Sequence, residues 1–293
     1  MEHIGIVGTG VMGLTATGKI ISAGHTVSAY DVSSDAAARA GQLGAQIAET
    51  PAEVAGKSDM VLLFLPGPVE VKNCVAGADG LLSAMQAGKI IVDMSTSDPT
   101  MSEQMAKLAD RKGIDFLDAP VLGRPISVGQ WALPVGGNNE AIERCKPVFQ
   151  LFAANIFHAG PVGAGHKIKL LNQLMFGAIN AMAAEMMAIA DKIGIAPRRL
   201  FEIITASQAG TVSNLFKELG QRIAEENYEN PTFTVNLLVK DIKLAVQMAR
   251  EKNAPPILAR TIELINEVSQ VQGLGNQDTA IMWQSYRNIW GSE

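Results

Sequence analysis

The sequence predicts an α/β domain with a mostly parallel, doubly wound sheet, followed by an all-helical domain. Three observations predict this fold class. The chain has 293 residues, and one domain usually takes about 100–200. The first half alternates short β-branched runs with helical stretches, and no clear strand pattern follows the glycine-rich segment at 160–165. We therefore expect domains at residues 1–163 and 164–293, joined by a connecting helix at 165–193.

Strands are expected where apolar, β-branched runs lie between turn residues. They are Ile4–Val7, Val27–Tyr30, Met60–Leu65, Ile90–Met94 and Phe116–Ala119, and then Trp131–Val135 and Ile156–His158. Helices are expected between them, at Val11–Ala23, Ser34–Leu43, Met101–Lys112 and Glu140–Phe152. Another helix is expected to begin at Thr50-Pro51, where a capping residue precedes a proline.

The second half has a helical pattern throughout. One uninterrupted pattern runs from His166 to Ile193 and ends at Gly194, as helix C-termini often do. Further helices are expected at Pro197–Ser207, Val212–Glu225, Asn236–Lys252, Pro256–Gln272 and Asp278–Trp290. Polar residues such as Lys169 and Glu185 interrupt the most apolar stretch, so we expect no membrane span.

The composition excludes several functional classes. With a net charge of −5 and scattered basic residues, we expect no nucleic-acid groove. Two cysteines, and four histidines without ligand spacing, argue against a disulfide framework and a metal site, and indicate a cytoplasmic protein. Because 47% of the residues are hydrophobic and only 18% are charged, we expect a homodimer or homotetramer.

A glycine-rich motif follows the first predicted strand and opens a helix. It reads Gly8-Thr9-Gly10-Val11-Met12-Gly13, the G-x-G-x-x-G spacing. In this motif the first glycine permits a tight turn, the second lets the backbone approach a pyrophosphate, and the third allows close helix–strand packing. The phosphate charge would meet free N–H groups at the helix N-terminus. A glycine-rich turn without a ligand is the alternative interpretation.

Asp31 supports the binding interpretation. It ends the second predicted strand, 18 positions after Gly13, where an acid can bind the adenosine ribose hydroxyls. No arginine follows within Val32-Ser33-Ser34 to hold a 2′-phosphate. We therefore expect a dinucleotide-binding domain and favour NAD over NADP as its cofactor. In the alternative interpretation, Asp31 caps the turn at the two serines.

Two further strand ends are expected to face the same crevice, because open α/β sheets bind ligands beyond the carboxyl ends of their strands. Leu65 and Pro66 follow one strand, and their backbone is expected to line the nicotinamide side of the cofactor. Thr96 follows another, and its hydroxyl is expected to do the same. Helix capping by Ser97 or Asp98 is the alternative interpretation of that turn.

A lysine at the start of the connecting helix is the candidate acid/base. Lys169 is expected in the first turn, and Asn172 and Gln173, three and four residues later, share its face. Hydride transfer between an alcohol and NAD needs a group that exchanges the hydroxyl proton. The positive end of a helix and partial burial both disfavour an ammonium ion. Taken alone, however, the pattern favours a solvated surface lysine.

Several motifs together resemble the β-hydroxyacid dehydrogenases, the family of 3-hydroxyisobutyrate dehydrogenase and tartronate semialdehyde reductase. Besides the glycine-rich motif they are Val92-Asp93-Met94-Ser95-Thr96, Asp118-Ala119-Pro120-Val121, Gly163-Ala164-Gly165 with Lys169 and Asn172, Val239-Lys240-Asp241, and Gly273-Leu274-Gly275 with Asp278. The resemblance covers essentially the whole chain. It implies a Rossmann domain, a long interdomain helix and a helical C-terminal domain, in a dimer or tetramer that needs no metal ion.

The resemblance also implies an activity and the roles of particular residues. The activity is the NAD-dependent interconversion of a small β-hydroxy acid and its semialdehyde. Lys169 matches the family's catalytic acid/base, Asn172 matches a substrate-orienting asparagine, and Lys240 matches a lysine that closes over the cofactor. Without the resemblance, Lys240 beside Asp241 would be interpreted as a surface pair.

The chain departs from the family pattern in two places. After Asp-Ala-Pro-Val the family usually has Ser-Gly-Gly, which holds the substrate carboxylate, whereas this chain has Leu122-Gly123-Arg124; Gln173 replaces a second asparagine. We expect these four residues and Asn172 to bind the substrate. Because a guanidinium binds carboxylate, sulfonate or phosphate groups, we expect a small acidic substrate. The alternative is that Arg124 pairs with an acid at a subunit interface.

Three other functions stay open on the sequence alone. The Gly-Arg pair resembles the corresponding loop of sulfolactaldehyde reductases, which suggests a sulfonated or other short acidic semialdehyde. A non-catalytic dinucleotide-binding module and an imine reductase share the architecture. Members of both classes normally lack the lysine that stands at Lys169, which favours the dehydrogenase.

Overall fold

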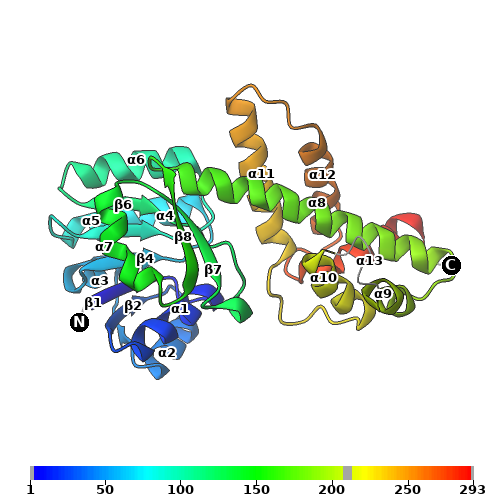
Figure 1. Ribbon diagram of the computed structural model, residues 1–293, viewed down its shortest axis with the longest axis horizontal. Coiled ribbons are helices and arrows are strands. Elements are labelled where there is room, and N and C mark those ends of the chain that lie inside the picture. The colour runs from blue at the N-terminus through cyan, green and yellow to red at the C-terminus, as the bar shows by residue number, and fades with distance from the viewer. Residues whose placement is uncertain (1–2, 207–212, 292–293) are drawn as a thin grey trace. The chain divides into compact units, whose positions relative to one another are not determined.

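The computed structural model describes residues 3–206 and 213–291 (Figure 1). The chain divides into two compact units, Met1–Lys169 and Leu170–Glu293. The division falls within the long helix α8 (Ala164–Lys192), close to its start. The first unit holds the sheet, and the second is built from helices.

The first unit is organised around one eight-stranded sheet with the order β3-β2-β1-β4-β5-β6-β7-β8. The strands are β1 (His3–Val7), β2 (Thr26–Tyr30), β3 (Gln46–Ile47), β4 (Met60–Leu63), β5 (Ile90–Asp93), β6 (Asp115–Asp118), β7 (Trp131–Gly136) and β8 (Ala153–Gly160). β7 runs antiparallel to β6, and the other strand pairs are parallel. The doubly wound, mostly parallel sheet is thus confirmed.

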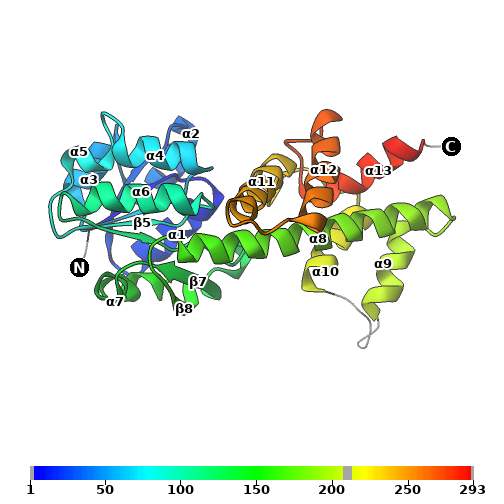
Figure 2. The same ribbon diagram turned by 90° about the horizontal axis from the view of Figure 1, so that it is seen from above.

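Helices cover both faces of this sheet (Figures 1 and 2). Along β1, Ile4 and Ile6 face one core, which also takes side chains from α1 (Val11–Ser22), α2 (Ser34–Gln42) and α7 (Asn139–Phe149). Val7 faces the other core, with α3 (Pro51–Lys57), α4 (Pro68–Ala76), α5 (Leu81–Ala84) and α6 (Pro99–Asp110). Because both faces are covered, the central strands are apolar on both sides, which explains the continuous apolar runs in the sequence.

The structure adds four elements that the sequence patterns do not indicate: β3, α4, α5 and the 3₁₀ turn η1 (Pro125–Ser127). β3 has two residues, both exposed, and is too short to show a period. α4 begins at Pro68, in a Pro-Gly-Pro segment that predicts only a turn. The strand expected over Met60–Leu65 ends at Leu63, and the Leu65 N–H donates to the Ser95 hydroxyl at 2.9 Å.

The second unit continues α8 and adds α9 (Pro197–Ala206), α10 (Asn214–Ala224), α11 (Val235–Glu251), α12 (Ile257–Val271), the 3₁₀ turn η2 (Thr279–Ile281) and α13 (Met282–Trp290). Its described residues form helices and a single isolated β-bridge, so the expected all-helical organisation is confirmed. Two of the expected helix ends, Ser207 and Val212, lie outside the described residues. One apolar core packs the second half of α8 against α9, α10 and α13.

α8 is long and apolar enough to cross a membrane by length and composition, but half of its most apolar window is buried inside the protein. Buried core helices of soluble proteins satisfy the same criterion. The helix also buries two polar side chains, those of Gln173 and Asn180. Both donate hydrogen bonds to other parts of the second unit, to Asp241 and to the Thr279 carbonyl.

Candidate functional site

The glycine-rich loop lies between β1 and α1, where the strand order of the sheet reverses. Gly8 has φ +91°, and a Cβ on it would collide with the Phe64 carbonyl. A Cβ on Gly13 would collide with the Gly8 carbonyl. Around Gly10, by contrast, an added Cβ would meet nothing within 4 Å. Gly8 and Gly13 therefore allow the loop to fold, and Gly10 leaves the backbone open to a ligand.

The N-terminus of α1 is suited to an anion. Gly10 is the N-cap and supplies no side-chain cap, and the first turn holds no acidic residue. Val11 is 61% exposed, so this end of the helix borders solvent. Unpaired N–H groups and the positive end of a helix dipole attract phosphate groups. The loop and helix together fit the pyrophosphate of a dinucleotide at the switch point of the sheet.

Asp31, which follows β2, binds the glycine-rich loop through Thr9. Its carboxylate accepts hydrogen bonds from the Thr9 N–H at 2.7 Å and from the Ser33 N–H at 2.8 Å. The turn-capping interpretation of Asp31 is therefore confirmed. It does not compete with ribose binding, because an ionised carboxylate has about four acceptor positions.

The ends of β4 and β5 continue this edge of the sheet. Leu65 is joined to Ser95 by the hydrogen bond described above, and Pro66 is exposed. Thr96 is half-buried. Asp98 is the N-cap of α6 and accepts from the Thr100 N–H at 2.8 Å, so the capping interpretation holds for this residue. Because β1, β4, β5 and β6 are adjacent and parallel, the loops that follow them lie at one edge of the sheet.

Lys169 is held by the loop that follows β6. Its ammonium donates a hydrogen bond to the Val121 carbonyl at 2.8 Å, and its side chain is half-buried. The sequence predicts Lys169 in the first turn of the connecting helix. α8 begins at Ala164, however, so Lys169 lies in the second turn. The influence of the helix dipole falls off within the first turn, so the dipole contributes less to its chemistry than expected. The contact with Val121 brings the candidate acid/base to the predicted substrate loop.

The predicted substrate loop, Leu122-Gly123-Arg124, is held by backbone contacts. Leu122 exchanges two backbone hydrogen bonds with Ala132 of β7, at 2.9 and 3.0 Å. Gly123 packs so closely on the Trp131 ring that a Cβ would collide with it. The Arg124 carbonyl accepts from the indole N–H of Trp131 at 2.8 Å. The half-buried Arg124 side chain therefore starts from a well-defined position.

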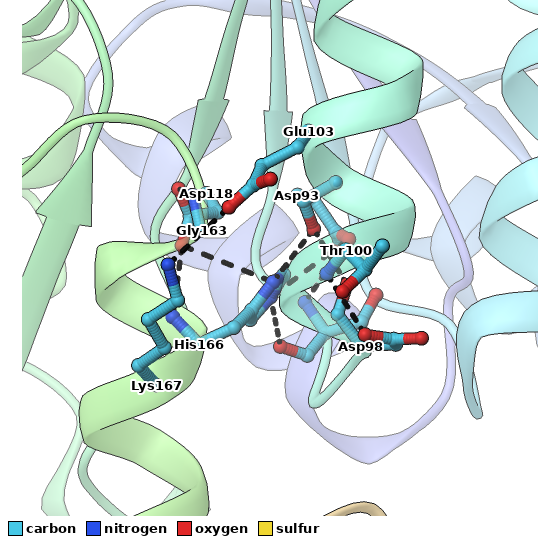
Figure 3. Close-up of polar contacts among 10 residues, drawn as sticks. Asp93, Asp98, Thr100, Glu103, Asp118, Gly163, His166 and Lys167 are labelled. Carbon is cyan, nitrogen blue, oxygen red and sulfur yellow. Dashed lines mark hydrogen bonds and ion pairs between the residues drawn. The ribbon is translucent and has the colours of Figure 1, made fainter. Parts of the chain in front are cut away.

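A buried cluster of ionisable side chains lies beside this site, and the sequence patterns did not indicate it (Figure 3). His166, on α8, lies between Asp93 at the end of β5 and Asp118 at the end of β6, and all three side chains are fully buried. Burial raises the pKa of the Asp118 carboxyl, and the nearby His166 and two backbone N–H groups oppose the rise. Two acids ending adjacent buried strands were the signal that could have found it.

In the second unit, Asn172, Gln173 and Lys240 gather around one buried acid, Asp241. The Gln173 amide donates to Asp241 at 2.6 Å, and the Asn172 amide lies 3.4 Å from the Gln173 carbonyl oxygen. Lys240 forms an ion pair with Asp241 at 2.6 Å. Asp241 is only 1% exposed, so interpreting Lys240 and Asp241 as a surface pair is wrong for the acid. Gln173 thus anchors a polar network.

Comparison with known proteins gives matches along both units. Residues 3–160 match the family model of the NAD-binding domain of 6-phosphogluconate dehydrogenase. Residues 163–286 match the family model for NAD binding in NADP-dependent 3-hydroxyisobutyrate dehydrogenase. The two matches meet near the start of α8.

Similar proteins match over nearly their full length. The 2-(hydroxymethyl)glutarate dehydrogenase of Eubacterium barkeri is 32% identical, over 98% of this chain and 96% of its own. The L-threonate dehydrogenase of Cupriavidus necator is 30% identical, over 96% of this chain and 95% of its own. The solved structure of 3-hydroxyisobutyrate dehydrogenase from Salmonella typhimurium has a TM-score of 0.89 at 27% identity and covers 97% of this chain and 99% of that one.

Proposed function

The chain belongs to the β-hydroxyacid dehydrogenase family, and from that premise we propose that it interconverts a small acidic β-hydroxy acid and its semialdehyde, with Lys169 as the acid/base. Membership makes it an NAD(P)-dependent oxidoreductase that acts on a CH–OH group. The dehydrogenase class is therefore preferred over the two alternatives from the sequence, a non-catalytic dinucleotide-binding module and an imine reductase.

The hydrogen bond from Lys169 to the Val121 carbonyl carries the proposal. It holds the amine beside Leu122-Gly123-Arg124, at the edge of the sheet where the dinucleotide loop also lies. A nicotinamide dinucleotide, when bound, supplies the two-electron oxidant or reductant. In oxidation, neutral Lys169 takes the hydroxyl proton as the C–O bond becomes a carbonyl. In reduction, the ammonium form returns a proton to the new alkoxide oxygen.

We propose NAD as the preferred dinucleotide. An acid at this strand end accepts hydrogen bonds from ribose hydroxyls, and the negative charge of Asp31 would repel a 2′-phosphate. The side chains that follow, Val32 and Ser33, offer no cation, and Val32 is 91% exposed. A phosphate there would find no compensating charge in this segment.

We propose that Arg124 binds the acidic group of the substrate. A planar guanidinium forms two parallel hydrogen bonds to a carboxylate or sulfonate. The named relatives act on hydroxy acids, as their names state. Arg124 supports a substrate of the same chemical class here, with a sulfonated semialdehyde as the variant that also fits a guanidinium.

The pH dependence of the two directions tests the role of Lys169. The oxidation rate should rise with pH as Lys169 loses its proton, and the reduction rate should fall over the same range. The measurement is kcat/KM for both directions in one buffer series. Profiles that are flat in both directions would contradict an acid/base role.

Substrate binding by Arg124 is tested separately. Arg124→Ala should raise KM for the best acidic substrate about 10- to 100-fold, as expected for loss of a charge-assisted contact, and leave NADH binding unchanged. Arg124→Lys keeps the charge but loses the planar fork, so its KM should lie between those of wild type and Arg124→Ala. An unchanged KM in Arg124→Ala would show that the guanidinium does not bind the substrate.

A further inference from the structure

We propose that His166 is a positioning residue: together with Asp93 and Asp118 it clamps the start of α8 onto the ends of β5 and β6, and so sets the place of the Lys169 amine. The inference rests on the proposed function, because it assigns a purpose to Lys169. The three side chains form the buried clamp, and all of it lies in the first unit.

Asp118 supplies the cap that the start of α8 needs. The first four N–H groups of a helix have no partner within the helix. The Asp118 carboxylate accepts from the Gly163 N–H at 2.7 Å and from the His166 N–H at 2.8 Å (Figure 3). It acts as an N-cap side chain would, although it belongs to a strand end 48 residues away from His166. Its negative charge also lies at the positive end of the helix.

The His166 ring ties the helix to β5 and α6. Its Nε2 lies 3.1 Å from the Ser95 carbonyl oxygen, which can only accept, so this nitrogen carries the donated proton. Its Nδ1 lies 2.9 Å from the Ser102 hydroxyl of α6. The backbone N–H of His166 is already held by Asp118. One residue therefore fixes α8 against two strand ends and a helix.

The clamp also places an imidazole ring between two buried acids. The second oxygen of Asp93 is buried, makes no hydrogen bond, and lies 3.8 Å from His166 Nε2. Asp118 lies 3.8 Å from Nδ1 on the other side of the ring. An apolar side chain at 166 would remove the ring from between the two acids, so that Asp118 would keep only its two backbone N–H donors and Asp93 only that of Ser95. Such a loss displaces the surrounding segments or draws in water.

The clamp and Lys169 are joined along one short stretch of chain. Lys169 follows His166 by three positions on α8, so the two residues share a helix face. The Lys169 amine binds the carbonyl of Val121, three residues after Asp118. Asp118 thus fixes the helix start, and the segment directly after it receives the lysine. A shift of α8 relative to β6 would move the amine away from its partner.

Lys167 provides an internal comparison. It lies one residue from His166 but pairs with Glu103 of α6 at 3.3 Å, and not with the β6 loop. Both lysines are half-buried, so the labelling of each can be followed in the same protein. If the clamp acts on Lys169, a change at His166 should alter the labelling of Lys169 more than that of Lys167.

The experiment uses His166→Gln and His166→Leu in the full chain, with His158→Gln as a matched control at an exposed histidine. For each protein we would measure kcat and KM, NADH binding by fluorescence, and acetylation of Lys169 relative to Lys167 by mass spectrometry. A misplacement of about 1 Å costs about 100-fold in rate, so kcat should fall to that extent in His166→Leu. It should fall about 10-fold in His166→Gln, which keeps one N–H donor for Ser95. The dissociation constant of NADH should stay within about twofold in the variants that fold.

The labelling ratio should change in both His166 variants and stay at the wild-type value in His158→Gln. In addition, His166→Gln should not slow the residual turnover of Lys169→Ala, because the two residues act through one group. An unchanged labelling ratio in the His166 variants would overturn the inference. So would an equal fall in turnover when His166→Gln is introduced into wild type and into Lys169→Ala. If His166→Leu does not fold, His166→Gln decides. If instead Lys169→Ala keeps full turnover, the proposed function fails, and the labelling ratio still reports whether His166 positions the lysine.

Discussion

Gly10 and Gly13 are three residues apart in one loop, and the structure separates their roles. A methyl group added at Gly10 meets nothing within 4 Å, whereas one added at Gly13 collides with the Gly8 carbonyl. Gly10 also has φ −62° and ψ −166°, which alanine adopts without strain. We therefore expect Gly10→Ala to weaken dinucleotide binding without unfolding the protein, and Gly13→Ala to destabilise the fold.

The expected changes in stability and in affinity follow from these contacts. At Gly10, the lower entropy of the unfolded chain and the poorer N-cap roughly cancel, which leaves the free energy of unfolding within about 0.5 kcal/mol of wild type. The methyl group would occupy the space where a pyrophosphate approaches, so we expect a loss of about 1.5–3 kcal/mol, or roughly 10- to 100-fold in Kd. At Gly13, overpacking against backbone should cost about 1–3 kcal/mol or more, and should lower Tm by about 2–4 °C for each kcal/mol.

Two measurements check both variants: Tm by differential scanning calorimetry, and the Kd of NADH by fluorescence titration. Gly10→Ala should keep its Tm and lose affinity. Wild-type affinity for NADH in Gly10→Ala would refute the reasoning, because the backbone at Gly10 would then not be the place where the phosphates bind. An unchanged Tm in Gly13→Ala would contradict the packing argument.

Three further predictions concern charge and assembly. Asp31→Asn should weaken NADH binding and narrow the preference for NADH over NADPH, because the charge that repels a 2′-phosphate is removed; equal losses for both dinucleotides in fluorescence titrations would contradict this. Burial raises the pKa of Asp118 from 3.8, so its contribution to stability is fully present below that value and is lost as pH rises through the raised pKa. Urea unfolding from about pH 4 to about pH 7 should therefore show a flatter pH dependence of stability in Asp118→Asn, and identical slopes would contradict the assignment. We also propose a homo-oligomer: light scattering should give at least twice the 31.1 kDa chain mass, and a monomer would contradict it. The assembly should involve an apolar stripe of α8 formed by exposed Ile168, Leu171, Met175, Met182 and Ile189.

The sequence predicted the features that depend on neighbouring residues. Continuous apolar, β-branched runs located the strands, and the glycine spacing located the loop that the structure places at the reversal of the strand order. Local signals also predicted the turn-capping roles of Asp31 and Asp98 as alternatives, and the structure shows both. At Asp31, binding and capping use the same carboxylate, which is why the sequence could not separate them.

The contacts that the sequence did not reveal join distant segments. His166 binds groups that lie 48, 64 and 71 positions away, and Gln173 binds an acid 68 positions away. A histidine without ligand spacing gives no local sign of such partners. Likewise, Asp241 next to Lys240 looks like an exposed pair until the burial of the acid is known. Elements of two to four residues, such as β3 and α5, are too short to show a period.

The most direct test of the central claim compares wild type with Lys169→Ala for NADH oxidation. The substrates would be methylmalonate, tartronate and succinic semialdehydes and sulfolactaldehyde, with NADPH in parallel. We expect turnover of at least one acidic semialdehyde by wild type, a fall of about 100-fold or more in kcat in the variant, and unchanged NADH binding. Turnover that persists in Lys169→Ala at the wild-type rate would contradict the assignment of Lys169 as the proton donor.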